Sequence, residues 1–276
     1  MMKSFVKSIS AGACALSLAA FSTGAFSIGL PVSVQESAIT GASPNAITVD
    51  QLSGQYDEIF TVTGLTGPTT GTFVTEAIFN AGGWFNGGSP VITQVNGFGT
   101  GGYGLYAKFH AAGSFAVSGT TLSFQGASAY IELWSDPSVN TNYDVKATAV
   151  GSIANLNLVS GAGSITDDQF LGSASLLLAG DGNGTTSGLA NGNFELLFGN
   201  FSLGVPDGEN YFVGPRPFYL VLDLNGNFQS FNPLTTRDIA LLNNSANAFF
   251  TVPEPSALAL AGLALIGLGL SRRKTS

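Results

Sequence analysis

Oxygen-bearing side chains recur at alternate positions in two short Gly-containing segments, and calcium prefers ligands of this kind. Asp181 and Asn183 lie in the sequence Asp-Gly-Asn-Gly-Thr, and Asp223 and Asn225 lie in Asp-Leu-Asn-Gly-Asn. An EF-hand loop needs Gly at its sixth position and Glu at its twelfth, and neither segment has them. Both segments therefore predict hairpin turns, with an irregular calcium site as the alternative. No firm metal site and no other cofactor follow from the sequence.

Pairs of carboxylates hydrolyse glycosidic bonds when they stand about 5–9.5 Å apart. The strand-borne or strand-adjacent candidates are Glu132, Asp136, Glu195 and Asp223. All 17 acidic residues except Glu254 fall between residues 26 and 251, so chance alone brings some pair to this distance. The sole histidine, His110, could act as the base of a serine hydrolase, but the chain has no G-x-S-x-G motif to supply the nucleophile. A single histidine also provides too few ligands for a zinc or copper site. We therefore predict a protein that is not an enzyme and has no catalytic residue.

Exposed aromatic side chains form platforms on which sugar rings stack. The candidates are Trp84, Trp134 and Tyr143, with Tyr103 and Tyr106 as further members of the group. Trp134 follows Ile131-Glu132-Leu133, so alternation along a strand places it on the face of Glu132, opposite the apolar neighbours. We therefore expect Trp134 on the surface, whereas most aromatic residues of a chain with 21 Phe are expected in the core.

The elements that would position these side chains are short strands. Alternating or apolar runs are separated by clusters of Gly, Asn, Ser and Asp, a pattern typical of all-β domains. Residues 218–224 alternate, and the pair Asn225-Gly226 predicts a hairpin turn before residues 227–231. Further strands are predicted near residues 56–63, 72–79, 104–110, 115–118, 121–125, 130–134, 145–153, 170–178 and 194–198. No long segment between the two ends has a helical period, so residues 26–251 predict a single antiparallel β-sandwich-like domain.

The first 25 residues are typical of a secretory signal peptide. Lys3 and Lys7 precede a short apolar run over residues 9–21, and small residues follow up to Ala25. At about 1.5 Å per residue, this run is too short to cross a bilayer as a helix. Cys14 lies inside the run, so removal of the signal leaves a mature chain without a thiol. We therefore predict an exported protein without disulfides.

The last 25 residues, 252–276, have three parts in a fixed order. The first is a motif of Val252, Pro253, Glu254 and Pro255. Its prolines favour an extended, accessible backbone. Residues 257–270 form an apolar run that predicts a hydrophobic helix of about 21 Å. The third is a basic flank of Arg272, Arg273 and Lys274. Because basic flanks stay on the cytoplasmic side, the body of the protein is expected outside the inner membrane.

This three-part order resembles the PEP-CTERM sorting signal of Gram-negative bacteria. The resemblance implies that an exosortase, a membrane transpeptidase-like enzyme, acts near the proline-bracketed motif after transient anchoring in the inner membrane. It also implies delivery to the cell surface or the extracellular matrix. PEP-CTERM proteins are usually found in species that make exopolysaccharide and a biofilm or floc matrix.

Segments of the body are similar to parts of flocculation-associated PEP-CTERM proteins. They begin at Gln51 (QLSGQYDEIF), Tyr103 (YGLYAKF), Ile131 (IELWSDP), Asp167 (DDQFLG) and Asn210 (NYFVGPRPFY). This resemblance implies a non-catalytic protein that acts together with exopolysaccharide in flocculation or biofilm formation. The alternatives that remain are a secreted carbohydrate-binding module and, from another class, a secreted glycoside hydrolase.

The charge of the chain is divided unevenly between its parts. The whole chain has 9 basic and 17 acidic residues, and only 9% of its residues are charged. The basic residues between positions 26 and 251 are Lys108, Lys146, Arg216 and Arg237. Nucleic acid is therefore excluded as a partner, because binding to phosphates requires many Lys and Arg side chains. We expect matrix polysaccharide as the partner, with divalent cations bridging the acidic body to an acidic matrix.

Overall fold

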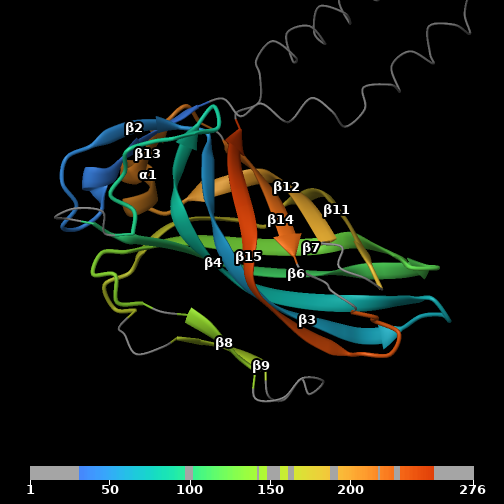
Figure 1. Ribbon diagram of the computed structural model, residues 1–276. Helices are drawn as coiled ribbons and strands as arrows, with labels where there is room; N and C mark the ends of the chain where they lie inside the picture. Colours follow the sequence, from blue (N-terminus) through green and yellow to red (C-terminus); the bar gives the residue numbers. More distant parts are fainter. Residues whose placement is uncertain are drawn as a thin grey trace, which may run out of the picture.

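Figure 1 shows the computed structural model of the chain, which describes residues 31–96, 102–141, 143–147, 156–160, 165–186, 192–216, 218–226 and 231–251. The predicted signal peptide over residues 1–25 and the predicted sorting segment over residues 252–276 lie outside these ranges. Nearly all of the described chain is antiparallel β-structure, and the predicted all-β class is therefore confirmed.

The elements follow one another along the chain. The strands are β1 (Val32–Gln35), β2 (Ala46–Val49), β3 (Gln51–Leu65), β4 (Thr70–Asn86), β5 (Ser89–Pro90), β6 (Gly104–Ser118), β7 (Thr121–Asp136), β8 (Tyr143–Ala147), β9 (Leu156–Ser160), β10 (Gln169–Ala174), β11 (Leu177–Thr185), β12 (Gly192–Leu203), β13 (Phe212–Gly214), β14 (Phe218–Gly226) and β15 (Asp238–Thr251). The described helices are the 3-10 turn η1 (Glu36–Ala38) and the short α1 (Asp207–Tyr211).

One large sheet closes on itself. The strands β12, β11, β7, β6, β4, β3, β15 and β14 pair in that order, and β14 pairs again with β12. The short β10 follows β11 along the chain and pairs with both β7 and β12. Closure satisfies the backbone hydrogen bonds of strands that would otherwise be exposed sheet edges. The predicted two-sheet sandwich is not confirmed, because these pairings join the strands into a single sheet.

Two segments that predicted hairpin turns lie within strands instead. Asp181 and Asn183 belong to β11, and Asn225 and Gly226 belong to β14. Glycine is tolerated in β11 because a neighbouring side chain occupies the space: a Cβ on Gly182 would lie 2.1 Å from the Phe194 ring. The glycines of this segment therefore let neighbouring side chains pack directly against the β11 backbone. The same glycines make the local sequence resemble a turn, although β11 continues through them.

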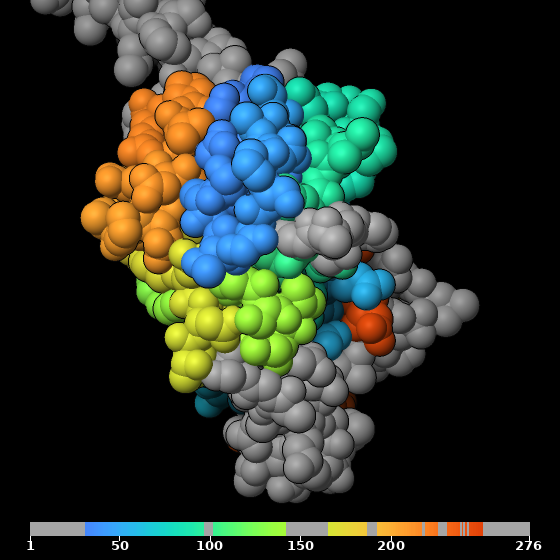
Figure 2. Space-filling model, turned by 90° about the vertical axis from the view of Figure 1, so that its left-hand side faces the viewer, coloured from blue at the N-terminus to red at the C-terminus, as the bar shows by residue number. Residues whose placement is uncertain are grey.

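A smaller unit packs at one end of the closed sheet. Strands β13, β1 and β2 form a three-stranded sheet, and α1 contacts β10, η1 and β1. Figure 2 shows residues 31–50, in blue, between the orange segment that carries α1 and β13 and the teal segment that follows β5. The β8–β9 hairpin, in contrast, contacts β3 and β4 (Figure 1).

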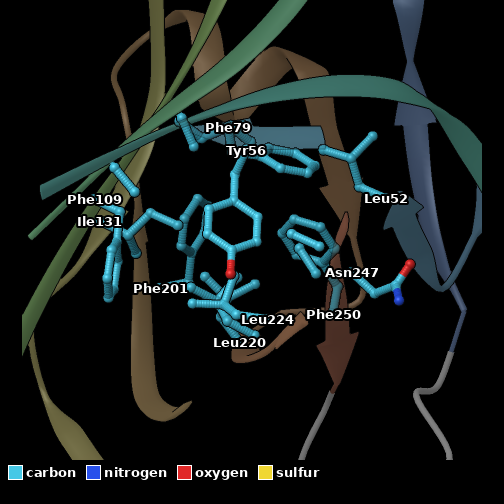
Figure 3. Close-up of a pocket in the computed structure, with 16 residues that line it drawn as sticks. Leu52, Tyr56, Phe79, Phe109, Ile131, Phe201, Leu220, Leu224, Asn247 and Phe250 are labelled. Atoms are coloured by element: carbon cyan, nitrogen blue, oxygen red, sulfur yellow. The ribbon is translucent and has the colours of Figure 1, made fainter. Parts of the chain in front are cut away.

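The inside of the closed sheet is a packed apolar core. Tyr56, Phe109, Phe201 and Phe250 point toward one another across it in Figure 3. They surround a cavity of only about 30 Å³, with no polar surface. A void of this size does not admit a sugar ring, because ligand sites typically measure about 300–1,000 Å³. A sugar-binding site is therefore expected on the outer surface.

Candidate functional site

The outer face of β6, β7 and β10 gathers the aromatic and charged residues that the sequence placed on a strand surface. Cross-strand pairing aligns Tyr106 with Trp134 and then Phe170, and it aligns Lys108 with Glu132. Leu133 on the other face of β7 is buried in the core, and Trp134 is half-buried. The predicted orientation of Trp134 is therefore confirmed.

Trp134 is held by its neighbours on this face. Its Nε1 donates a hydrogen bond to Glu132 at 3.2 Å, and the Phe170 ring centre lies 5.0 Å from that of Trp134. The Lys108 Nζ lies 5.2 Å from the Trp134 ring centre and 5.9 Å from that of Tyr106, which are cation–π distances. These contacts hold the Trp134 ring in place on this face of the sheet.

Tyr130 is the most exposed aromatic residue on this face. Its side chain is 41% exposed, and its hydroxyl donates to Glu132 at 2.6 Å. This hydrogen bond to a carboxylate raises the pKa of Tyr130, because ionisation would remove the donated proton. Glu132 therefore holds two aromatic side chains at once, one on each side of its own position in β7.

A shallow hollow of about 320 Å³ lies beside Tyr130. Its side chains come from three neighbouring strands, since Glu76 of β4 pairs with His110 of β6, which pairs with Tyr130 of β7. Lys108 also lines it, and Glu132 lies next to Lys108. We call the space bounded by Glu76, Lys108, His110 and Tyr130 the Tyr130 hollow. His110 was considered from the sequence for its chemistry alone, and neither Tyr130 nor Glu76 was predicted as part of a site.

The loop that follows β7 is tied to the same face. Asp136 is buried and accepts backbone hydrogen bonds from Ser138 and Thr141, which closes a tight turn. Asp168 accepts a hydrogen bond from the Tyr106 hydroxyl at 2.6 Å and another from the Thr141 hydroxyl. Burial, opposed by these hydrogen bonds, raises the pKa of Asp168. Both aspartates therefore stabilise the loop that borders the aromatic group.

Trp84 is not a surface platform, contrary to the prediction. Its side chain is 0% exposed, and its Nε1 donates to the Tyr211 hydroxyl at 3.1 Å. Burial is imposed by the small unit that packs over this end of the sheet, which the sequence pattern around Trp84 does not reveal. Tyr103 is buried there as well. The side chain of Tyr143 lies outside the described residues, so its predicted role in sugar stacking stays a prediction.

A buried carboxylate organises that end of the molecule. Glu36 accepts hydrogen bonds from the side chains of Asn45, Thr93 and Tyr103, and from the Gln94 backbone N–H at 2.9 Å. The Tyr103 hydroxyl lies 2.8 Å from that of Tyr211, and burial raises the pKa of both tyrosines. Sequence reasoning missed this network, because its members are up to 175 positions apart and no local motif joins them.

The residues predicted for calcium come together on the opposite part of the outer surface. Asp181 of β11 pairs with Glu195 of β12, which pairs with Asp223 of β14. Asn193 of β12 likewise pairs with Asn183 of β11 on one side and with Asn225 of β14 on the other. Within the described ranges, however, no group of three or more His, Cys, Asp or Glu residues is placed to hold a metal ion. Calcium at Asp181, Asn183, Asp223 and Asn225 therefore stays a prediction.

The carboxylates considered for glycoside hydrolysis lie in two places, with Glu132 and Asp136 on β7 and with Glu195 and Asp223 on the paired strands β12 and β14. The Asp136 carboxylate accepts the backbone hydrogen bonds of its turn, and the Glu132 carboxylate accepts hydrogen bonds from Tyr130 and Trp134. Glu195 and Asp223 are neighbours, but neither lines the interior cavity or the Tyr130 hollow. These positions give no observation in favour of hydrolysis.

The described chain begins and ends at the same end of the closed sheet (Figure 1). Val32 pairs with Val49, and the carbonyl of the next residue, Asp50, accepts the Phe250 backbone N–H at 3.1 Å. Thr251 still pairs with Tyr219, so β15 runs up to the residue before Val252. None of the described helices has the length and apolar character needed to cross a bilayer, and the apolar run over residues 257–270 lies outside the described ranges.

Comparison with known proteins identifies this C-terminal segment. A family model described as the PEP-CTERM protein-sorting motif matches residues 251–274. No curated protein and no solved structure matches the chain. The matched residues include the proline-bracketed motif, the apolar run and the basic flank. The chain therefore carries, directly after the last strand of its closed sheet, a PEP-CTERM protein-sorting motif, which marks it for export, transient membrane anchoring and exosortase processing.

Proposed function

We propose that this chain is a cell-surface or matrix protein that acts non-enzymatically in exopolysaccharide-dependent cell aggregation, as in floc or biofilm formation. The sorting motif over residues 251–274 is the observation that carries the proposal, because it routes the folded domain to the outside of the cell. The resemblance of the body to flocculation-associated proteins supports the role in aggregation. Exosortase and matrix polysaccharide are the proposed partners.

The position of the motif next to the fold supports this route. Phe250 is 1% exposed, and its backbone N–H donates a hydrogen bond to the Asp50 carbonyl. The folded domain therefore fixes the chain up to the start of the motif. At about 3.3–3.6 Å per residue, the stretch from Thr251 to Ala257 spans at most about 22 Å. While residues 257–270 are anchored, the closed sheet therefore stands close to the outer surface of the membrane, and the processing enzyme must act in that narrow interval.

Alanine replacement of Pro253, Glu254 and Pro255 tests the routing. The variant should remain in the membrane fraction as a longer, uncleaved chain, because the enzyme no longer recognises its substrate. The readout is the apparent mass of the protein in membrane and extracellular fractions. Alanine replacement of Thr275 and Ser276, beyond the basic flank, is the matched control and should be processed normally. Normal release of the first variant contradicts the proposed routing.

Deletion of the protein tests the role in aggregation. Cells that lack it should settle more slowly and should lose polysaccharide from the cell-bound fraction to the medium. Restoration by the wild-type chain, but not by the uncleaved variant, connects aggregation to processing. Unchanged settling and unchanged polysaccharide location in the deletion strain contradict the proposal.

A carbohydrate-binding module is the second candidate function. The Tyr130 hollow favours it, since an exposed aromatic ring and polar side chains from three strands share one open space. The two candidates are compatible, because a matrix protein that holds cells together needs a surface for polysaccharide.

A further inference from the structure

We infer that the Tyr130 hollow binds an uncharged sugar unit of matrix polysaccharide. This inference rests on the proposed function, and it names the ligand class and the residues that contact it. The hollow measures about 320 Å³ and opens on the outer face of the sheet. Its volume lies within the range of about 300–1,000 Å³ for ligand sites, whereas the interior cavity is ten times smaller.

The aromatic wall of the hollow is fixed before any ligand arrives. The hydrogen bond from Tyr130 to Glu132 restrains the phenol ring, and Glu132 is itself restrained by Trp134. Because strand pairing also fixes the backbone of β6 and β7, little conformational freedom is lost when a sugar packs against Tyr130. The exposed ring supplies the apolar surface on which the C–H groups of a pyranose rest.

The polar wall offers both donors and acceptors. Glu76 accepts hydrogen bonds, the Lys108 ammonium donates them, and the His110 imidazole can do either. Among the described residues, the side chains of Glu76 and His110 form no hydrogen bond with another side chain or with the backbone. Sugar hydroxyls both donate and accept, so they match this mixture, and ligands with only one kind of group do not.

The charges around the hollow disfavour charged ligands. Glu76 lines it and Glu132 stands beside it, so an acidic polysaccharide meets two carboxylates in a domain that is acidic throughout. The positive charge of Lys108, which also lines the hollow, repels a cation at the same place. The combination leaves an uncharged sugar as the ligand with the smallest electrostatic penalty.

A second outer hollow serves as an internal comparison. It measures about 550 Å³ and has Gly82 and Gly83 in its floor, with the exposed Ile92 on one side. None of its described lining residues is charged. A Cβ on Gly83 would meet no heavy atom within 4 Å, so Gly83→Gln adds a side chain beside this second hollow at a position where its Cβ has room.

The test is binding of the full-length chain, in detergent, to exopolysaccharide from the producing cells. The probe is separated by anion exchange into a neutral and an acidic fraction. Iodide quenching of Trp134 fluorescence reports binding close to the hollow, because Trp84 is fully buried and inaccessible to iodide. We expect the neutral fraction to bind and to protect Trp134 from quenching.

Three variants locate the site. Tyr130→Ala and Glu76→Gln should each weaken binding by about tenfold, whereas Tyr130→Phe, which keeps the ring, should retain more of it. Glu195→Gln on the other side of the sheet and Gly83→Gln in the second hollow are controls that should bind as the wild type does. Circular dichroism melts verify that every variant is folded.

The outcomes are distinct. Binding of the acidic fraction alone, wild-type binding by Tyr130→Ala, or an equal loss in Glu195→Gln or Gly83→Gln overturns the inference, as does the absence of any binding. If binding is lost at the hollow but the deletion strain still settles normally, the site stands and the aggregation role fails. If deletion abolishes aggregation while Tyr130→Ala binds normally, the aggregation role stands and the site fails.

Discussion

Thr75 donates its hydroxyl hydrogen bond to Glu58 at 2.5 Å inside the closed sheet. Both residues lie between the large apolar core that contains Tyr56 and the Phe-rich cluster around Phe60 and Phe73. Burial raises the pKa of Glu58 to about 7, and the hydrogen bond from Thr75 opposes this rise. An acidic group in the core therefore titrates near neutral pH in the folded protein.

The raised pKa of Glu58 makes the stability of the fold depend on pH. The folded state binds the proton more tightly than the unfolded state, whose Glu58 pKa is near 4.5. Glu58 therefore contributes its full stabilisation below about pH 4.5 and loses it as the pH rises through about 7, a change of about 3 kcal/mol. Unfolding free energies of wild type and Glu58→Gln, compared between pH 4.5 and 8, should diverge in this window. Parallel pH profiles contradict the assignment.

Removal of the Glu36 carboxylate should loosen the small unit at the end of the sheet. Glu36→Ala leaves the buried Tyr103 hydroxyl and the half-buried donors of Asn45 and Thr93 without their acceptor. We expect a loss of at least about 1–3 kcal/mol in the free energy of unfolding, measured by urea titration, because this is the cost of one buried donor left unpaired. Glu209→Ala is the control, because the Glu209–Arg216 ion pair of 3.6 Å is exposed and should contribute at most about 1 kcal/mol. A similar small loss for both variants contradicts the central role of Glu36.

The glycine of β11 should be required by packing. Gly182→Ala forces a Cβ against the Phe194 ring, and we expect destabilisation by about 1–3 kcal/mol in thermal melts. Gly83→Ala is the matched variant, since its Cβ meets open space and should leave stability unchanged or slightly higher. Equal effects of the two substitutions would show that glycine in these strands acts through backbone freedom instead of close approach.

The row of Asp181, Glu195 and Asp223 tests the calcium prediction. Like charges directly opposite one another on paired strands repel, so Glu195→Gln should raise stability by about 0.5 kcal/mol at low salt. If calcium binds here, it should raise the melting temperature of the wild type more than sodium chloride of equal ionic strength. Asp181→Asn combined with Asp223→Asn should abolish that difference. An identical response to both salts contradicts calcium binding, and flocs that survive a chelator contradict bridging by divalent cations.

Local patterns in the chain predicted much of the surface and the core. The alternation around Trp134 placed it correctly, because which face a side chain takes follows from its position along a strand. The same reasoning could not place Trp84, whose burial depends on Tyr211 and Phe250, more than a hundred positions away. Glu76 and His110 likewise became neighbours of Tyr130 only through pairing between strands.

The sequence by itself determined that this protein carries a signal for export and transient membrane anchoring, and it determined the class of fold. The sorting motif and the strand periodicity are local, so residues near one another in the chain are sufficient to establish them. Tertiary structure alone decided that one sheet closes through the pairing of β12 with β14, and that Asn225-Gly226 continues a strand. The physical reason is that closure and burial depend on contacts between distant strands, whereas alternation is identical in a sandwich and in a closed sheet.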